Sequence, residues 1–226
     1  MCCTKAKQGL PKCLEDLNTR IRIPGDIQVD AIVFYDNHEP LTKCYNRAID
    51  EIRRVEIEIP TFAVFLHDDI GLADCDLFHK IIESEWDVIG AVGGKGWFIP
   101  SGFDARNCPL IWTVASNGRG MSGFMLHHHD GKYMPSSYGE TPARTITLDG
   151  CFIVLTRNAI EKGLRWDTDF AWHFYDMSLT LSAHRMGLKV GTAPLLLQHE
   201  SIGESVRQPS FLESQKKFLK KYFDFE

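Results

Sequence analysis

Short apolar runs recur along the first half of the chain, and each ends in polar or turn-forming residues. Residues 30–35 (DAIVFY) and 61–66 (TFAVFL) are rich in β-branched and aromatic side chains, and both runs lead into aspartates. Residues 87–92 (DVIGAV) form a third run, which Gly93 and Gly94 close. Continuous apolar runs bounded by turn formers predict strands that are buried on both faces.

Stretches with helical spacing lie between these runs. Residues 40–54 repeat apolar side chains along one helix face, and residues 74–83 predict a second helix. The alternation of strands and helices favours an α/β fold with a mostly parallel central sheet flanked by helices. A further helix is predicted over residues 11–21. A strand before it would have to be very short, at residues 1–3, unless the chain begins inside a longer one.

The middle of the chain loses this regularity. Residues 94–144 are rich in Gly, Pro, Asn, Ser and His, which predicts a long irregular insertion of the kind that often forms a lid or a binding wall. The pattern then recovers, with a strand-like segment over 145–156 and a helix over 171–186. A last strand is predicted over residues 189–198, directly before His199 and Glu200.

Length and composition are those of one soluble globular domain. The chain has 226 residues, of which 44% are hydrophobic and 24% charged, and its net charge of −5 does not predict a nucleic-acid partner. Seven cysteines without a CxxC motif predict reduced thiols and a cytoplasmic location. Neither a signal peptide nor a membrane span is visible. The basic stretch QKKFLKKYF predicts an amphipathic C-terminal helix that packs on the domain, with peripheral membrane contact as the alternative.

Carboxylates follow several of the predicted strands. Asp36, Asp69 and the pair His199-Glu200 each come after an apolar run, and Asp149 lies beside one. Ligands of open parallel sheets bind outside the carboxyl ends of the strands, so these groups are expected along one crevice. Adjacent carboxylates repel each other unless a cation lies between them, and Mg²⁺ or Mn²⁺ would suit oxygen ligands and a diphosphate. The alternative is that the aspartates after residue 67 only cap a turn.

Three other segments contain polar, glycine or aromatic residues that could belong to a binding site. The run from His127 to His129 is expected in a solvated loop, because zinc-like spacing to further ligands is missing. The segment GAVGGKGW lacks the Walker pattern and is expected as a plain loop or as backbone close to a donor sugar. The aromatic residues of the insertion predict either an acceptor platform or a satellite core. These residues are Trp97, Phe103, Trp112, Tyr133 and Tyr138.

Four stretches together resemble GT-A-type glycosyltransferases of the family 2-like group. HDD after an apolar strand looks like a variant of the Asp-x-Asp motif of that group, and KCYNRAID is similar to its Tyr-Asn helix. LDGCFIVLTRNAIEKGLRWDTDF, HFYDMSLTLSAHRMGLKV and QHESIG resemble its later motifs in order and spacing, so that the likeness covers residues 30–203. The resemblance implies one GT-A domain over 1–226. It would comprise a nucleotide-binding half (1–93) and an acceptor-side half (94–226) with the insertion at 94–144.

The resemblance also implies roles for the carboxylates. Asp69, at the last position of the motif, and His199 match the metal ligands of the group. Asp68 is implied in metal or ribose binding, and Asp36 in contact with the nucleotide base or ribose. Asp149 matches a position near donor and acceptor. The implied cofactor is Mn²⁺ or Mg²⁺.

The resemblance further implies the reaction and its base. Asp176 matches the general base of inverting members, and its place near a helix N-terminus favours the ionised form. Tyr175 and His67 depart from the group, which carries acidic residues at both positions. The implied activity is transfer of a hexose from a nucleotide-diphosphate sugar, a UDP-sugar, to a hydroxyl of a glycan or similar acceptor. A retaining transferase, a nucleotide-sugar hydrolase and a non-catalytic binding domain remain alternatives.

Overall fold

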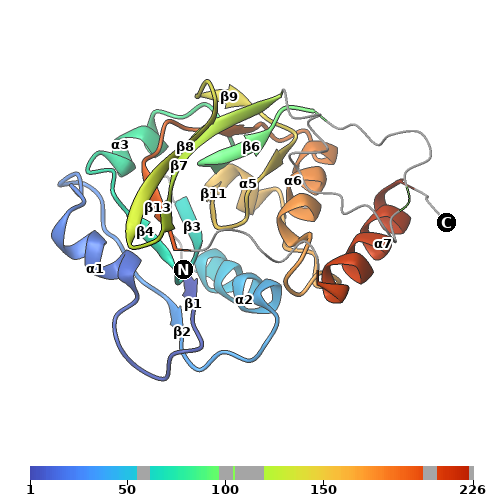
Figure 1. Cartoon of the computed structure of the whole chain (residues 1–226), viewed down its shortest axis with the longest axis horizontal. Coiled ribbons are helices and arrows are strands. Elements are labelled where there is room, and N and C mark those ends of the chain that lie inside the picture. The colour runs from blue at the N-terminus through green and yellow to red at the C-terminus, as the bar shows by residue number, and fades with distance from the viewer. Residues whose placement is uncertain (55–61, 97–103, 105–119, 201–207, 224–226) are drawn as a thin grey trace.

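A computed structural model describes residues 1–54, 62–96, 104, 120–200 and 208–223 of the chain (Figure 1). This part of the chain contains two sheets and six helices. The helices are α1 (Lys12–Thr19), α2 (Leu41–Arg54), α3 (Leu77–Ile82), α5 (Arg157–Glu161), α6 (Tyr175–Arg185) and α7 (Pro209–Phe223). Helices α1 and α3 lie at the left of Figure 1, and α6 and α7 at the right.

The central sheet has seven strands in the order β2-β1-β3-β11-β5-β12-β9. Its strands are β1 (Cys2–Cys3), β2 (Val33–Phe34), β3 (Phe62–His67), β5 (Val88–Gly90), β9 (Ala143–Arg144), β11 (Phe152–Thr156) and β12 (Val190–Thr192). Strand β11 is antiparallel to both β3 and β5, and β9 is antiparallel to β12, whereas β1, β2, β3, β5 and β12 share one direction. The predicted α/β fold class, with a mostly parallel sheet, is therefore confirmed.

A second sheet lies against the first, and the sequence did not predict it. Its order is β10-β6-β7-β13-β4, with β8 paired to β7. Its strands are β4 (Ile70–Leu72), β6 (Val92–Gly94), β7 (Met121–His129), β8 (Lys132–Gly139), β10 (Thr147–Leu148) and β13 (Leu197–His199). The apolar run at 87–92 thus divides between the two sheets, at Ala91. Glycine is needed beside this division, because a Cβ on Gly93 would lie 2.4 Å from the Thr147 carbonyl oxygen.

The prediction of a long irregular insertion at residues 94–144 is wrong for residues 121–139. Residues 121–139 form the hairpin β7–β8, which is the long twisted ribbon in front of the domain in Figure 1. Asp130 and Gly131 make its turn with positive φ angles of 48° and 76°, the conformation that an Asp-Gly pair favours in two-residue hairpins. Residues 97–103 and 105–119 of the insertion, with Trp97, Phe103 and Trp112, lie outside the described residues.

Other predicted elements exist with shifted ends. Strand β1 is the very short first strand that residues 1–3 allowed, and it pairs with β2 and β3. Helix α2 and strand β3 match their predicted ranges closely, whereas β2 keeps only Val33–Phe34 of the run at 30–35. The boundary proposed at residue 93 between two halves stays a prediction, and β6 (Val92–Gly94) spans it.

The core consists of two apolar clusters on opposite faces of the central sheet. Successive residues of β11 alternate between them: Phe152 and Val154 belong to one cluster, and Ile153 and Leu155 to the other. Helices α2, α5, α6 and α7 cover the face of Ile153, where Phe218 of α7 is fully buried. The predicted packing of the C-terminal helix is thus confirmed. Among the described residues, no helix has the length and hydropathy needed to cross a bilayer. The six described cysteines are free thiols.

A buried carboxylate holds β4 and β13 together. Asp74 is 6% exposed, and its Oδ2 accepts hydrogen bonds from the backbone N–H of Leu196 at 3.1 Å and from Lys80 Nζ at 2.6 Å. Its Oδ1 accepts a third hydrogen bond, from the Asp76 N–H at 3.2 Å. Asp74, just after β4, is thus linked to Leu196, just before β13, and these two strands carry the site described below.

The Asp74→Ala variant is expected to lower the free energy of unfolding by about 2–3 kcal/mol, because the partly buried N–H groups of Leu196 and Asp76 lose their acceptor and the partly exposed Lys80 ammonium keeps only the Pro194 carbonyl oxygen. Urea unfolding of the two proteins measures this difference. Asp76→Ala is the matched control, since the Asp76 side chain is 47% exposed and pairs with Arg22 on the surface. A loss below about 0.5 kcal/mol for Asp74→Ala, equal to that of the control, would contradict the assignment.

Candidate metal centre and carboxylate pair

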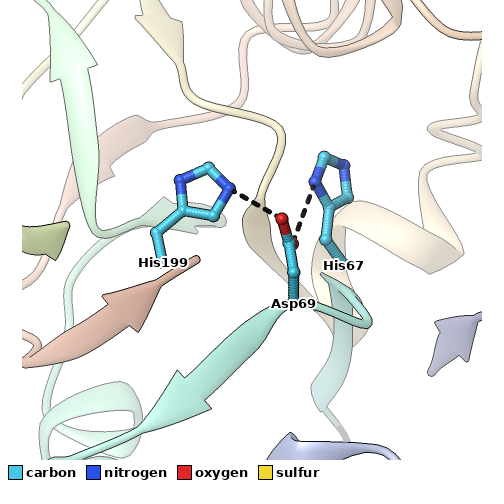
Figure 2. A group of neighbouring side chains, drawn as sticks. All are labelled: His67, Asp69 and His199. Carbon is cyan, nitrogen blue, oxygen red and sulfur yellow. Dashed lines mark ion pairs between the residues drawn. The ribbon is translucent and has the colours of Figure 1, made fainter. Parts of the chain in front are cut away.

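Three side chains converge where β3, β4 and β13 meet. Strand β3 ends at His67, the turn Asp68-Asp69 follows, and β4 starts at Ile70. Strand β13 is antiparallel to β4 with His199 opposite Ile70, which brings His199 beside Asp69. Figure 2 shows the imidazoles of His67 and His199 on either side of the Asp69 carboxylate. His199 Nε2 lies 3.5 Å from Asp69 Oδ2, and His67 Nδ1 lies 3.9 Å from Asp69 Oδ1.

This cluster has the properties of a cation site. One potential ligand atom from each of His67, Asp69 and His199 lies within 4.8 Å of the others. Asp69 Oδ1 is buried without a hydrogen-bond partner, and such an orphaned oxygen is costly unless a cation or donor satisfies it. Two imidazoles and one carboxylate suit Mn²⁺, Fe²⁺, Co²⁺ or Zn²⁺ better than Mg²⁺, which prefers oxygen ligands. The donor set therefore fits a transition metal.

The protonation states in the cluster follow from burial and charge. Burial opposes ionisation of Asp69, but the hydrogen bond and charge of His199, with His67, outweigh it and lower the Asp69 pKa. Burial likewise opposes protonation of His199, yet Asp69 and Asp149 outweigh it and raise the His199 pKa. For His67 burial dominates over the neighbouring carboxylates and lowers the pKa. His67 is thus neutral at physiological pH, as a metal ligand must be.

A pair of carboxylates lies beside this cluster. Asp176, in the first turn of α6, accepts hydrogen bonds from the N–H of Gly150 at 3.1 Å and of Met177 at 2.8 Å. Asp149, which follows β10, accepts one from the Cys151 N–H at 3.0 Å. The Asp176 residue keeps some exposed surface, but its carboxyl group is enclosed by protein.

The environment of Asp176 favours its protonated form. Burial is the largest cause, followed by the negative charge of Asp149, and together they raise the Asp176 pKa to about 7 although backbone N–H groups act against them. The helix N-terminus was expected to favour the ionised form, and it is outweighed here. A carboxyl group with a pKa near neutrality can both release and accept a proton under physiological conditions, as a general base must.

Tyr175 connects the two parts of the site. Its hydroxyl lies 2.6 Å from His67 Nε2, and the next residue of α6 is Asp176. The ring is 4% exposed and packs against Trp166. Trp172, in contrast, is 53% exposed and stacks on His67 with ring centroids 5.2 Å apart. The neighbouring His173 is buried against Phe211.

Two of the other predicted ligands are on the surface. Asp36 follows β2, is exposed, and pairs with His38 at 3.3 Å. Asp68 is exposed in the same turn as Asp69. The structure therefore brings together Asp69, His199, Asp149 and Asp176. His67 joins them, although the sequence marked it only as a departure from a motif. Its position directly before the two aspartates was the available signal.

The three consecutive histidines, His127 to His129, lie in strand β7, so the prediction that they belong to a solvated loop is wrong. His127 Nε2 lies 3.0 Å from the Tyr138 hydroxyl, and the His127 ring centroid is 5.7 Å from that of His199. An open cavity of about 510 Å³ is lined by His127, His129, Met134, Ser136 and Tyr138. Tyr133, considered for an acceptor platform, donates a hydrogen bond to Glu200 instead of packing in a core.

Ligands of open α/β sheets bind outside the carboxyl ends of the strands, and the candidate metal centre lies at such an end, after β3 and at the last residue of β13. The chain belongs to the glycosyltransferase-like family, whose model matches residues 1–222. Among solved structures it is similar to the inositol-1-phosphate CTP transferase from T. maritima. That likeness covers 85% of this chain and 68% of the other, with 13% sequence identity and a TM-score of 0.36. No curated protein matches the chain. The family assignment confirms the resemblance read from the motifs.

The raised Asp176 pKa has a consequence for stability. A carboxyl group whose pKa is about 7 in the folded chain and about 4 when unfolded destabilises the fold as pH rises between these values. The Asp176→Asn variant is therefore expected to be more stable than the native chain by about 1–3 kcal/mol at a pH of about 8, and this advantage shrinks towards a pH of about 4. Urea unfolding in the presence of a chelator measures it. An advantage that does not change with pH would contradict the raised pKa.

Proposed function

We propose that this chain is a metal-dependent glycosyltransferase that moves a hexose from a nucleotide-diphosphate donor, a UDP-sugar, to a hydroxyl of a glycan or similar acceptor, with inversion. One observation carries the proposal. A buried carboxyl group with a pKa near neutrality, on Asp176, lies next in sequence to Tyr175, whose hydroxyl touches the cluster of His67, Asp69 and His199. A base for the acceptor and a cation site for the leaving group are the two elements that such a transfer needs.

The metal would be held by His67, Asp69 and His199. When bound, it supplies positive charge that stabilises the departing diphosphate. The orphaned Oδ1 of Asp69 and the lowered Asp69 pKa support this role, because the carboxylate stays ionised and has a lone pair to offer. The two imidazoles favour Mn²⁺ over Mg²⁺ as the cofactor.

Asp176 would accept the proton of the attacking acceptor hydroxyl. In an inverting transfer the hydroxyl attacks the anomeric carbon from the face opposite the diphosphate, through an oxocarbenium-like transition state. The Gly150 and Met177 N–H groups fix the direction of the Asp176 carboxyl group, and Asp149 raises its basicity. Asp149 would bind a sugar hydroxyl. Asp36 and Asp68 are assigned to the nucleoside by the family resemblance alone.

Turnover with a panel of UDP-sugars and Mn²⁺ tests the proposal. The expected result is release of UDP that depends on an added hydroxyl acceptor, with a product whose anomeric configuration, read by NMR, is opposite to that of the donor. Retention of configuration would remove the role of Asp176 as an inverting base. Release of UDP at the same rate without acceptor would identify a nucleotide-sugar hydrolase instead.

A further inference from the structure

Tyr175 occupies the place where the metal cluster and the start of α6 meet, and the proposed reaction gives it no role. Its hydroxyl is 2.6 Å from Nε2 of His67. The Nδ1 of the same imidazole faces Asp69, 3.9 Å from Oδ1. The two nitrogens of His67 thus point at different partners, one at the phenol and one at the cation site.

This geometry determines where the proton of a metal-bound His67 would lie. A ligating imidazole presents a lone pair from one nitrogen and carries its proton on the other, where a hydrogen-bond acceptor fixes the tautomer and the ring orientation. Nδ1 is the nitrogen that faces Asp69, so the proton belongs on Nε2. The group within hydrogen-bond reach of Nε2 is the Tyr175 hydroxyl.

We propose that Tyr175 is a positioning residue of the metal centre. Its hydroxyl oxygen accepts the Nε2–H of His67 and holds the ring so that Nδ1 becomes a third ligand beside Asp69 and His199. This inference rests on the metal site of the proposed function. It adds an explanation of how a histidine, His67, can serve at a position where the family has an acidic residue. His67 stands in place of an acidic residue, and Tyr175, the second departure, supplies the partner that an imidazole ligand needs.

The Tyr175 hydroxyl is itself fixed by its surroundings. The ring is buried and lies 5.6 Å from the Trp166 ring, while Gly150 leaves the space that the hydroxyl fills. A Cβ at Gly150 would lie 2.3 Å from the Tyr175 oxygen, so a side chain there would displace it. Burial, followed by the charge of Asp176, raises the Tyr175 pKa well above its usual value, and the phenol stays neutral.

A second contact restrains the His67 ring from another side. Trp172 stacks on it, with centroids 5.2 Å apart and planes inclined by 17°. Trp172 and Tyr175 come from the same short segment at the start of α6, which also carries Asp176. The orientation of the metal ligand and the position of the proposed base therefore depend on one stretch of backbone.

Binding of Mn²⁺ to the full chain, measured by the EPR signal of the free ion, tests the inference without a substrate. The Tyr175→Phe variant keeps the packed ring and removes only the acceptor, and its affinity for Mn²⁺ is expected to fall about 10–100-fold. Tyr45→Phe is the matched control. Tyr45 is another buried tyrosine, packed on the same Trp166, and its hydroxyl donates to the Leu66 carbonyl oxygen instead of touching a metal ligand. Its affinity is expected to stay within about twofold of the native chain.

The outcomes separate this inference from the metal site itself. If the native chain binds Mn²⁺ and Tyr175→Phe binds it equally well, Tyr175 has no positioning role and the inference is overturned. The same follows if His67→Ala binds Mn²⁺ as tightly as the native chain. If the native chain binds no Mn²⁺, the metal part of the proposed function fails and this inference falls with it.

Two further measurements do not depend on the folding of Tyr175→Phe. Gly150→Ala, which crowds the hydroxyl from the backbone side, is expected to weaken Mn²⁺ binding in the same direction. In the native chain with ¹⁵N-labelled histidine and bound Zn²⁺, the NMR spectrum of His67 should show a proton on Nε2 and the metal on Nδ1. A proton on Nδ1 would overturn the inference.

Discussion

Replacement of Asp176 by asparagine is expected to lower the rate of sugar transfer by about 10²–10⁴-fold, the usual contribution of a general base. Asparagine has the same shape and still accepts a hydrogen bond from the Gly150 N–H, but it takes no proton from an acceptor hydroxyl. The affinity for Mn²⁺ and for UDP is expected to change by less than about twofold, because Asp176 is not one of the proposed metal ligands. Steady-state kinetics and calorimetry on the same preparation measure the two quantities.

The pH dependence gives this prediction a second readout. A base must be deprotonated to act, so the rate of the native enzyme is expected to rise with pH through the Asp176 pKa of about 7. This inflection should be missing from the residual activity of Asp176→Asn. Asp169→Asn is the control, because Asp169 is an exposed carboxylate that pairs with Lys217 and Lys221 outside the site. Native rates in Asp176→Asn would remove the assignment of the base.

Replacement of Asp69 by alanine is expected to weaken Mn²⁺ binding by more than about 100-fold, since the loss of even an outer residue of a metal site costs about 10–100-fold. Asp69 lies between the two imidazoles, and its removal takes away the carboxylate ligand that lies beside both His67 and His199. Turnover with UDP-sugars should fall with it. EPR titration with Mn²⁺ measures the affinity, and Asp169→Ala, at an exposed carboxylate that pairs with Lys217 outside the site, is the control.

The neighbouring Asp68 makes this experiment specific. It lies in the same turn but is exposed, so Asp68→Ala is expected to retain Mn²⁺ affinity and to affect only the nucleotide. An equal loss in Asp68→Ala and Asp69→Ala would show that both carboxylates bind the metal. Unchanged affinity in Asp69→Ala would contradict the metal centre as described.

The sequence predicted those parts of the fold in which one local pattern dominates. Helix α2 repeats apolar side chains along one face, and β3 is a continuous apolar run in the middle of the sheet; both were found with nearly correct ends. The family resemblance likewise pointed to Asp69 and His199, which the pairing of β4 with β13 brings together. For the helix and the strand, burial of one face or of both faces determines the choice of residues, so the pattern is readable from one sequence.

The remaining features depend on contacts between distant segments. The hairpin β7–β8 was missed because its strands carry many histidines and small residues and only partly bury their side chains, although the Asp-Gly turn was a usable signal. The division of residues 87–92 between two sheets depends on the close approach of Gly93 to Thr147. Apart from its position directly before the two aspartates, His67 is recognisable as a candidate ligand only when folding brings His199, far along the chain, close to it.

The raised Asp176 pKa has the same origin. A carboxylate at a helix N-terminus is expected to be ionised, and only the surrounding packing and the proximity of Asp149 reverse this expectation. The residues assigned to the nucleoside, Asp36 and Asp68, are exposed and remain predictions of the resemblance.

Calorimetric titration of UDP, with and without Mn²⁺, into the native chain and into Asp69→Ala tests the central claim most directly. We predict that UDP binds to the native chain only when Mn²⁺ is present and that this metal-dependent binding is lost in Asp69→Ala. UDP binding that is equal with and without Mn²⁺, or that persists in Asp69→Ala, would contradict a nucleotide-diphosphate site built on this metal centre. No binding of UDP to the native chain under any metal condition would contradict the UDP-sugar donor itself.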